Sequence, residues 1–392
     1  MSKPNNQAAS ASPQDTAAPY PGLRPYRREE RHLFFGRARD AALLCNQILA
    51  AHLTLFFGQS GRGKSSLLRT LLIPELEGEG SRIFAYDNWT PENPVAALAE
   101  ALSEFIEGSE KILDESAYDD KAGGLESAPL VARVRTASRP TSDSILPALV
   151  RRLTVYDPRP LVIVLDQFEE FFVHHEKLIP AMRRELAALV RLAANDDVRI
   201  VVSLREEFLA SLESFRRDIP GLFDSTYRLE PLTEDAVREA ITEPARAFGA
   251  LVDPALVDRL IADIEGGVKS TEQERALIGG ADIELPTLQM VLKQLWEAAS
   301  CDGRKQIDLG LYERLGGSRK VLADHVSKVM PRGHREQWLA ARLLRHLAPS
   351  SGLKAAFSVK DLAVLENQSA QRVGPELDRL AAAGTRHRGR GR

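Results

Sequence analysis

One stretch of the sequence decides the fold: Thr54-Leu55-Phe56-Phe57-Gly58-Gln59-Ser60-Gly61-Arg62-Gly63-Lys64-Ser65-Ser66-Leu67-Leu68. Its first part is apolar, as in a buried strand, its middle is rich in glycine, and its end has the apolar spacing of a helix. The glycines leave the backbone free to point successive N–H groups at one anion. The positive end of the following helix adds to that field. The stretch therefore predicts a strand, an anion-binding loop and a helix, in that order.

The loop matches the pattern G-x-x-x-x-G-K-[ST] of a P-loop, which binds the phosphates of a nucleotide. We expect Lys64 to reach the β- and γ-phosphates, and the hydroxyl of Ser65 to ligate Mg²⁺. The alternative is a simple glycine turn before a helix, but the preceding strand favours the nucleotide site. The predicted phosphate-binding residues are Gly58, Gln59, Ser60, Gly61, Arg62, Gly63, Lys64, Ser65 and Ser66.

The composition is that of an ordinary soluble protein. A chain of 392 residues is expected to hold two or three domains. It is 44% hydrophobic, and its formal net charge of −3 gives no basic excess that would point to nucleic acid. The two cysteines, Cys45 and Cys301, match no metal-binding spacing and suit a reducing compartment. No apolar run approaches the roughly 20 residues of a membrane span. We therefore expect a cytoplasmic protein with no membrane contact.

A second candidate site residue, Asp166, follows the apolar run Pro160–Leu165. Such a run predicts a strand that is buried on both faces of a parallel sheet. An acid at the carboxyl end of that strand would lie across the phosphates from the P-loop serine and hold Mg²⁺ through water, the Walker B role. Glu169 and Glu170 are the nearby acids that can polarise an attacking water. Alternatively, they only favour the first turn of the next helix.

A cation, Arg205, ends the next predicted strand, Val198–Leu204. It would sense or neutralise the γ-phosphate, or else pair with Glu206 or Glu207. The segment Glu107–Ser144 is charged and aperiodic and is predicted to be an exposed insertion. Other predicted strands are Arg82–Tyr86 and Thr226–Leu229, and predicted helices are Ala41–Ala51, Pro94–Ile106 and Ile145–Leu153. This alternation predicts an α/β fold, a three-layer domain with a parallel sheet.

The second half of the chain is predicted to be helical. Strand patterns vanish after Thr233, which is followed by acids and is placed as a helix N-cap, and helices continue to about Ala299. Pro286 opens one of these helices, which ends near Trp296. Three short helical patterns then suit a helix-turn-helix or winged-helix arrangement: Trp338–Leu347, Val359–Leu365 and Gly374–Ala383.

The main alternative function is a winged-helix regulator that binds DNA and uses ATP only to order its fold. A DNA reader needs a basic recognition helix. The last predicted helix, Gln371–Ala383, carries Arg372 and Arg379 but also Glu376 and Asp378. This balance of charge argues against DNA as a partner. A third hypothesis, a P-loop kinase for a small molecule, finds no clustered acid and base residues in the helical half.

Together these features resemble the STAND class of signal-transduction NTPases, relatives of the AAA+ proteins, and in particular the bacterial novel STAND group. The segments Tyr20–Tyr26 and Phe34–Arg37 are similar to the N-terminal motif of that group. Leu165–Phe172 is similar to its Walker B signature, and also to the NACHT pattern in which an acidic pair follows the Mg²⁺ aspartate. The resemblance covers about residues 20 to 384.

The resemblance implies roles for particular residues. Phe35, Gly36 and Arg37 would border the adenine, Arg205 would be a sensor, and Pro286 would lie over the base or sugar as the lid proline. The implied cofactors are ATP or ADP and Mg²⁺. ADP would hold the winged helix on the NTPase domain, and exchange for ATP would open the molecule and allow self-association. Without the resemblance, the N-terminal segment would simply cap the edge of the core.

The implied domains are a disordered leader at 1–19, a P-loop NTPase domain at 20–231, a helical lid at 232–302, a winged-helix-like domain at 303–385 and a basic flexible tail at 386–392. Two departures from the family follow. Gln167 stands where many P-loop ATPases have the catalytic acid, so this role passes to Glu169 or Glu170. Family members continue into a hairpin and a His-acid motif, but here Arg-Gly repeats surround His387. We therefore expect a truncated member that lacks part of its ADP latch, with an effector that the sequence does not identify.

Overall fold

The computed structural model describes residues 18–119, 144–265, 284–303, 305–331, 333–347 and 359–385. The chain divides into two compact units. Residues 37–230 form one, the sheet unit, and residues 1–36 with 231–392 form the other, the helical unit. The N-terminal segment thus groups with the helices, whereas the sequence placed it in the NTPase domain. The division of the helical half into a lid and a winged-helix-like domain stays a prediction.

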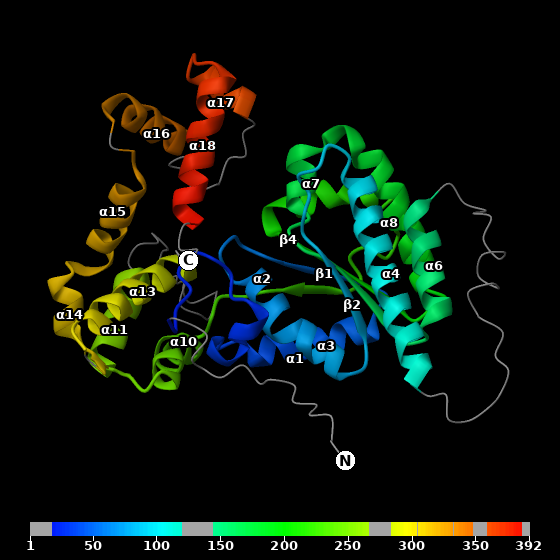
Figure 1. The fold of residues 1–392 in the computed structure, drawn as a ribbon, viewed down its shortest axis with the longest axis horizontal. Coiled ribbons are helices and arrows are strands. Elements are labelled where there is room, and N and C mark those ends of the chain that lie inside the picture. Colours follow the sequence, from blue (N-terminus) through cyan, green and yellow to red (C-terminus); the bar gives the residue numbers. More distant parts are fainter. Residues whose placement is uncertain are drawn as a thin grey trace. The chain divides into compact units, whose positions relative to one another are not determined.

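A five-stranded sheet is the centre of the sheet unit (Figure 1). Its order is β2-β3-β4-β1-β5, and all neighbouring strands are parallel. The strands are β1 Leu53–Gly58, β2 Arg82–Tyr86, β3 Leu161–Leu165, β4 Val198–Arg205 and β5 Thr226–Arg228. The predicted α/β fold with a parallel sheet is confirmed. Because the strands are parallel, their carboxyl ends all meet at one edge of the sheet.

Helices cover both faces of this sheet, with α1 and α3 on one and α4, α6 and α8 on the other (Figure 1). The helices of the sheet unit are α1 Ala38–Ala50, α2 Lys64–Leu67, the π turn η3 Leu68–Leu72, α3 Ile73–Gly78, α4 Pro94–Asp119, α6 Ile145–Tyr156, α7 Glu169–His174, α8 Ile179–Ala193 and α9 Leu209–Leu212. All five residues of β3 are buried, as a strand covered on both faces requires.

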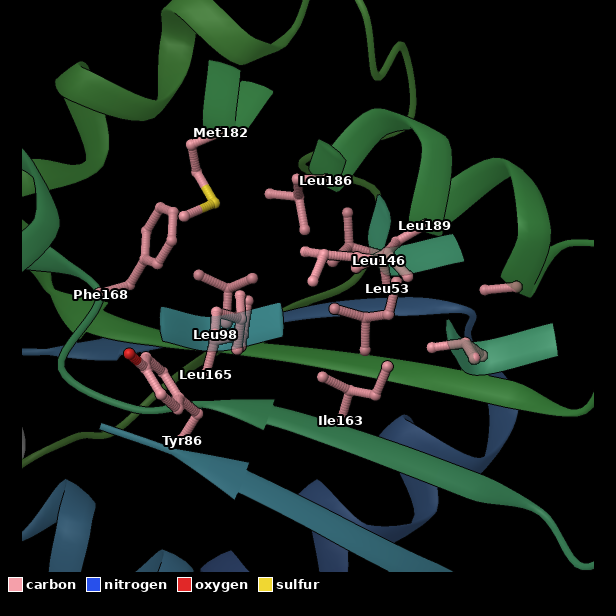
Figure 2. Close-up of a cluster of buried hydrophobic side chains, with 14 of the residues drawn as sticks. Leu53, Tyr86, Leu98, Leu146, Ile163, Leu165, Phe168, Met182, Leu186 and Leu189 are labelled. Carbon is pink, nitrogen blue, oxygen red and sulfur yellow. The ribbon is translucent and has the colours of Figure 1, made fainter. Parts of the chain in front are cut away.

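The main apolar core lies between the sheet and α4, α6 and α8 (Figure 2). Ile163 and Leu165 contribute to it from β3, because alternate residues of a strand point to the same face. Helix α8 contributes Met182 and Leu186 from the opposite side. Phe168, which follows β3, extends the core toward the carboxyl edge of the sheet, so the turn after β3 is anchored in the core.

The helical unit has a core of its own, which includes the N-terminal segment. Tyr20 is buried there, and its hydroxyl donates a hydrogen bond to the carbonyl of Ile241. The predicted N-cap is confirmed, since the amide of Ala236 donates to Thr233 Oγ1 at 3.3 Å. The helices are η2 Arg28–Leu33, α10 Glu234–Ala247, α11 Pro254–Glu265, α13 Leu285–Cys301, α14 Leu309–Arg314, α15 Gly317–Val329, α16 His334–Leu347, α17 Val359–Leu365 and α18 Ala370–Thr385.

Two predictions about these elements were wrong. Helix α4 continues to Asp119, into the segment from Glu107 that was predicted to be aperiodic, because glutamate, lysine, leucine and alanine there favour a helix despite one glycine. Strands also do not vanish from the second half, since β6 Leu251–Val252 pairs in parallel with β7 Gln306–Ile307. Two residues are too few to show a periodic pattern. The rest of the predicted insertion, most of the leader and the basic tail lie outside the described residues.

The three helices predicted near the C-terminus are present as α16, α17 and α18. They share a small apolar core that includes Leu343, Leu362 and Val373. No strand pair accompanies them among the residues that the structure describes, so the wing stays a prediction. Both cysteines are free, Cys45 buried and Cys301 exposed. Within the described parts of the chain, no helix combines the length and the apolar character needed to cross a membrane.

Helix α6 begins with no cap from its own side chains. Instead, the buried carboxylate of Glu185, on α8, accepts hydrogen bonds from the amides of Ile145 and Leu146 at 3.2 and 3.0 Å. The first amides of a helix have no partner within it, and they carry partial positive charge. Glu185 therefore caps a helix that lies about 40 residues away in sequence.

We expect Glu185→Ala to lower the free energy of unfolding by about 1–3 kcal/mol, because buried amides lose their acceptor. The matched control is Glu176→Ala at an exposed position, which should change it by less than about 0.5 kcal/mol. Urea denaturation followed by circular dichroism measures both changes. Equal effects of the two substitutions would show that Glu185 is not a cap.

Candidate functional site

The residues predicted to bind phosphate and metal meet at the carboxyl edge of the sheet. The P-loop follows β1, Asp166 follows β3, and Arg205 ends β4. Strand β4 lies between β1 and β3, and Gly58 is paired with Arg205 in the register. The charges of Asp166 and Arg205 both act on Lys64. The structure thus brings together three of the predicted catalytic residues from separate parts of the sequence.

The P-loop has the backbone that its glycines allow. Gly61 and Gly63 have φ values of +82° and +91°. Gly63 is the N-cap of α2 in the left-handed conformation, which residues with a Cβ rarely adopt. The Lys64 ammonium donates to the carbonyls of Gly58 and Gln59 at 2.7 and 3.1 Å, so it lies over the loop. Burial lowers the pKa of Lys64.

Arg37, predicted to border a base, is buried and braces the P-loop. Its Nη1 donates to Asp40 Oδ2 at 2.8 Å, and its Nη2 donates to the carbonyl of Arg62 at 3.2 Å. The hydroxyl of Tyr227, on β5, donates to Asp40 Oδ1 at 2.7 Å. Asp40 and Tyr227 were missed from the sequence, because nothing local marks a contact between α1 and β5. Arg37 therefore holds the P-loop directly, and Tyr227 of β5 holds the Asp40 carboxylate to which Arg37 is bound.

Three other predicted residues, Phe35, Gly36 and Pro286, belong to the helical unit. Gly36 has a φ of +81°, and a Cβ there would lie 2.5 Å from the carbonyl oxygen of Ala236. Glycine is therefore required for this close packing against α10. Pro286 lies in the first turn of α13, where its missing N–H costs nothing. Their contacts with a base or sugar stay predictions.

Asp166 is buried, and fixed donors orient its carboxylate. Oδ1 accepts hydrogen bonds from Ser203 Oγ at 2.8 Å and from the amide of Gln167 at 2.9 Å. The indole N–H of Trp89 donates to the Asp166 carbonyl at 2.7 Å. The second carboxylate oxygen, Oδ2, is buried and makes no hydrogen bond. An oriented oxygen without a donor suits a hydrated Mg²⁺ ion, so Asp166 fits the metal-binding role predicted for it.

Ser203 and Trp89 are site residues that the sequence reasoning missed. Ser203 carries the one hydroxyl of β4, and it is fully buried. A single hydroxyl inside an apolar strand indicates a buried hydrogen bond, because a buried hydroxyl needs a hydrogen-bond partner. Trp89 is also buried, but its position after β2 gives no indication from the sequence that its ring reaches Asp166.

The phenylalanines that follow Asp166 anchor the acidic turn. Phe168 packs edge-on against Trp89 at 5.0 Å between ring centroids, and stacks on Phe171 at 5.5 Å. Phe172 packs edge-on against Phe168 at 5.4 Å. The three rings are tied to the core. They therefore hold the first turn of α7, with its two glutamates, at the carboxyl edge of the sheet.

The two glutamates have different surroundings. The Glu169 side chain is 4% exposed and binds Arg205 twice, through Nε at 3.0 Å and through the backbone amide at 3.2 Å. Glu170 is 34% exposed and lies 3.8 Å from Arg205 and 3.4 Å from His174. Burial raises the pKa of Glu169, while the positive charges of Arg205 and Lys64 oppose this rise. Glu169 is therefore the acid that shares an environment with the P-loop lysine.

Arg205 pairs with these glutamates across the turn after β3. Its predicted alternative partner, Glu206, instead pairs with Arg228 at 3.0 Å. The Arg205 side chain is 28% exposed, so it keeps access to the edge of the sheet where the P-loop lies. The edge therefore presents two cations, Lys64 and Arg205, beside the Asp166 and Glu169 carboxylates.

A family model described as Novel STAND NTPase 1 matches residues 19–384 of this chain. No curated protein matches the sequence.

The Orc1 protein of Aeropyrum pernix in complex with DNA has 16% identity and a TM-score of 0.47, covering 90% of this chain and 85% of its own. Cdc6p of Pyrobaculum aerophilum has 16% identity and a TM-score of 0.45, covering 89% and 86%. A Walker-type ATPase of Pyrococcus abyssi has 15% identity and a TM-score of 0.41, covering 91% and 92%. These remote structural similarities carry no argument about activity.

Gln167 has a φ of +54°, in the left-handed region that residues other than glycine, asparagine and aspartate avoid. Its amide is one of the donors to Asp166, so the strained residue lies at the site.

We expect Gln167→Val to lower the free energy of unfolding by about 1–2 kcal/mol, because a β-branched side chain fits this conformation badly. Gln167→Asn should change it by less than about 0.5 kcal/mol. Guanidinium denaturation measures both, and a valine variant as stable as the asparagine variant would contradict the strained backbone.

Proposed function

Because the chain belongs to the Novel STAND NTPase 1 family, we propose that it is an ATP-binding switch with slow, Mg²⁺-dependent hydrolysis. The observation that carries the proposal is the edge of the sheet where Lys64, Asp166 and Arg205 meet. Two cations and a loop of backbone amides there suit a polyphosphate, and a carboxylate with an unpartnered oxygen suits its metal ion.

Nucleotide phosphates would replace the internal partners of Lys64. In this structure the ammonium donates to two carbonyls of its own loop. Phosphate oxygens are charged and form stronger hydrogen bonds with an ammonium than neutral carbonyls do. The loop itself is held in place by Arg37, so its amides need not reorganise around the ligand. The preference for ATP over GTP rests on the family alone.

Mg²⁺ would be held by the hydroxyl of Ser65 and, through water, by Asp166. When bound, the ion neutralises the phosphate oxygens and the charge that develops on them during hydrolysis. Ser203 and the Gln167 amide keep Asp166 Oδ1 occupied, so Oδ2 is the carboxylate oxygen that would hold the ion through water. The direction of the carboxylate is therefore set before the metal arrives.

We assign the general base to Glu169, because it is buried, has a raised pKa and senses the charge of Lys64. In this structure the Glu169 carboxylate is paired with Arg205. While this ion pair is intact, the carboxylate is occupied and does not act as a base. The γ-phosphate would compete for Arg205 and release Glu169 to accept a proton from the attacking water. A base that must first lose its partner would make hydrolysis slow, as the proposed switch requires.

The switch would alternate between a closed and an open state. ADP would favour the closed state, and ATP would favour the open state and self-association. These features of the proposal are supported by the family membership, with contacts from Phe35, Gly36 and Pro286 to the base or sugar as its expected means.

Lys64→Ala tests the proposal directly. We expect it to weaken Mg·ATP binding by about 100-fold or more, equivalent to about 2.7 kcal/mol, because the phosphates lose a partly buried cation. Isothermal titration measures the affinity, and Lys177→Ala, at an exposed position, is the control. If Lys64→Ala binds Mg·ATP as tightly as the unmodified chain, the nucleotide site is wrong.

The assignment of the base is tested by Glu169→Gln and Glu170→Gln, two amides that keep the shape of the side chain. Glu169→Gln should slow ATP hydrolysis by about 10²–10⁴-fold, because no other group takes the proton. Glu170→Gln should slow it by no more than a few-fold. Phosphate release under single-turnover conditions measures both rates, and titration confirms that both variants still bind ATP. A larger loss in the Glu170 variant would reverse the assignment.

A further inference from the structure

A cavity of about 420 Å³ lies at the amino end of β2. Its volume is within the range of small-molecule pockets in proteins. It is lined by Glu77, Gly80, Ser81, Arg82, Ile83, Phe105, Ser109 and Arg159. These residues come from the end of α3, the start of β2, the middle of α4 and the loop before β3, all within the sheet unit.

The cavity is separate from the nucleotide site. Strands β2 and β3 are parallel, with Arg82 paired to Leu161 at their amino ends and Tyr86 paired to Leu165 at their carboxyl ends. Four residues of strand span roughly 13 Å, and Asp166 lies beyond the far end. The nucleotide and the occupant of this cavity would therefore bind at opposite edges of the sheet.

Arg82 is the main polar feature of the cavity. Its side chain is 5% exposed, and its Nη2 donates to the carbonyls of Asp157 and Arg159 at 2.8 and 3.1 Å. Its Nε lies 3.3 Å from Asp157 Oδ2. Its Nη1 is buried and makes no hydrogen bond. A buried guanidinium nitrogen without an acceptor is unfavourable, so it points to an acceptor that a ligand would bring.

Ser81 provides a second unused group, because its Oγ is also buried without a hydrogen-bond partner. Two guanidiniums, from Arg82 and Arg159, share the single carboxylate of Asp157. Glu77 lines the cavity as well and carries a negative charge. The two donors without an acceptor, Ser81 Oγ and Arg82 Nη1, therefore belong to adjacent residues at the amino end of β2.

The remaining wall is apolar. Ile83 and the ring of Phe105 line the cavity, and Phe105 is held in place by Phe84 at 5.5 Å between ring centroids. The Ser109 hydroxyl donates to the Phe105 carbonyl at 2.9 Å and so turns toward its own helix. A ligand for this cavity would need one anionic end and an apolar body.

We propose that this cavity binds a small organic anion, with a carboxylate or phosphate on Arg82 Nη1 and Ser81 Oγ, and an apolar or aromatic body against Phe105 and Ile83. The charged group would be recognised by hydrogen bonds to a buried cation, which are stronger than bonds between neutral groups. The proposal does not rest on the ATPase activity, since it concerns the opposite edge of the sheet.

The test uses three probes of similar size: phenyl phosphate, 3-phenylpropionate and the neutral 3-phenylpropanol. Isothermal titration is carried out with the full chain in saturating Mg·ADP, and repeated with Lys64→Ala, so that probe phosphate does not enter the P-loop. We expect at least one anion to bind once per chain with a Kd of about 1 mM or tighter, and the alcohol at least about 10-fold more weakly. The stronger of the two anions identifies the charged group.

Arg82→Gln should weaken binding of that anion at least about 10-fold, whereas Arg216→Gln, which removes an exposed arginine paired with Glu213, should leave it unchanged. Because Arg82 also binds Asp157, a second variant, Ser109→Trp, fills the cavity from α4 and leaves both arginines in the chain. It should abolish binding while circular dichroism shows a folded chain. The proposal is overturned if neither anion binds saturably below about 10 mM. It is also overturned if the alcohol binds as well as the anions, or if folded Arg82→Gln or Ser109→Trp binds unchanged.

Discussion

The hydrogen bond from Ser203 to the Asp166 carboxylate joins two central strands at the edge where the nucleotide site is built. It forms only because β3 and β4 are parallel neighbours whose carboxyl ends coincide. The core under the sheet fixes that register, and the rings after Asp166 fix the turn. Trp89 connects the two, since it packs on Phe168 and also donates to the Asp166 carbonyl. The position of the Asp166 carboxylate therefore depends on the packing of the whole sheet unit.

The two cations at the carboxyl edge of the sheet find their partners within the chain itself. Lys64 uses carbonyls of its own loop, and Arg205 uses the carboxylate of Glu169. Each of these internal contacts occupies a group that a nucleotide, its metal or an attacking water would need. Internal contacts of this kind avoid unpaired buried ions. This arrangement suits a switch better than a fast enzyme.

The parts of the fold that could be predicted from the sequence have local signals. The P-loop glycines, the apolar run of β3 and the cap at Thr233 each act within a few residues, so pattern and propensity identify them. The missed features are contacts between distant segments. Glu185 caps α6 from α8, and Arg37 reaches the carbonyl of Arg62 across a strand and a loop. The different surroundings of Glu169 and Glu170 also needed the structure, because adjacent residues differ only in which way the turn points them.

The most direct test of the account is equilibrium dialysis of the purified, folded chain against ATP, ADP and GTP, with and without Mg²⁺. The site at the carboxyl edge predicts one adenine nucleotide per chain at saturation, tighter binding of ATP when Mg²⁺ is present, and weaker binding of GTP. If the folded chain binds neither ATP nor ADP, the P-loop is not a working nucleotide site and the account is contradicted. If ATP binds equally well without Mg²⁺, the metal-binding role of Asp166 and Ser65 is contradicted.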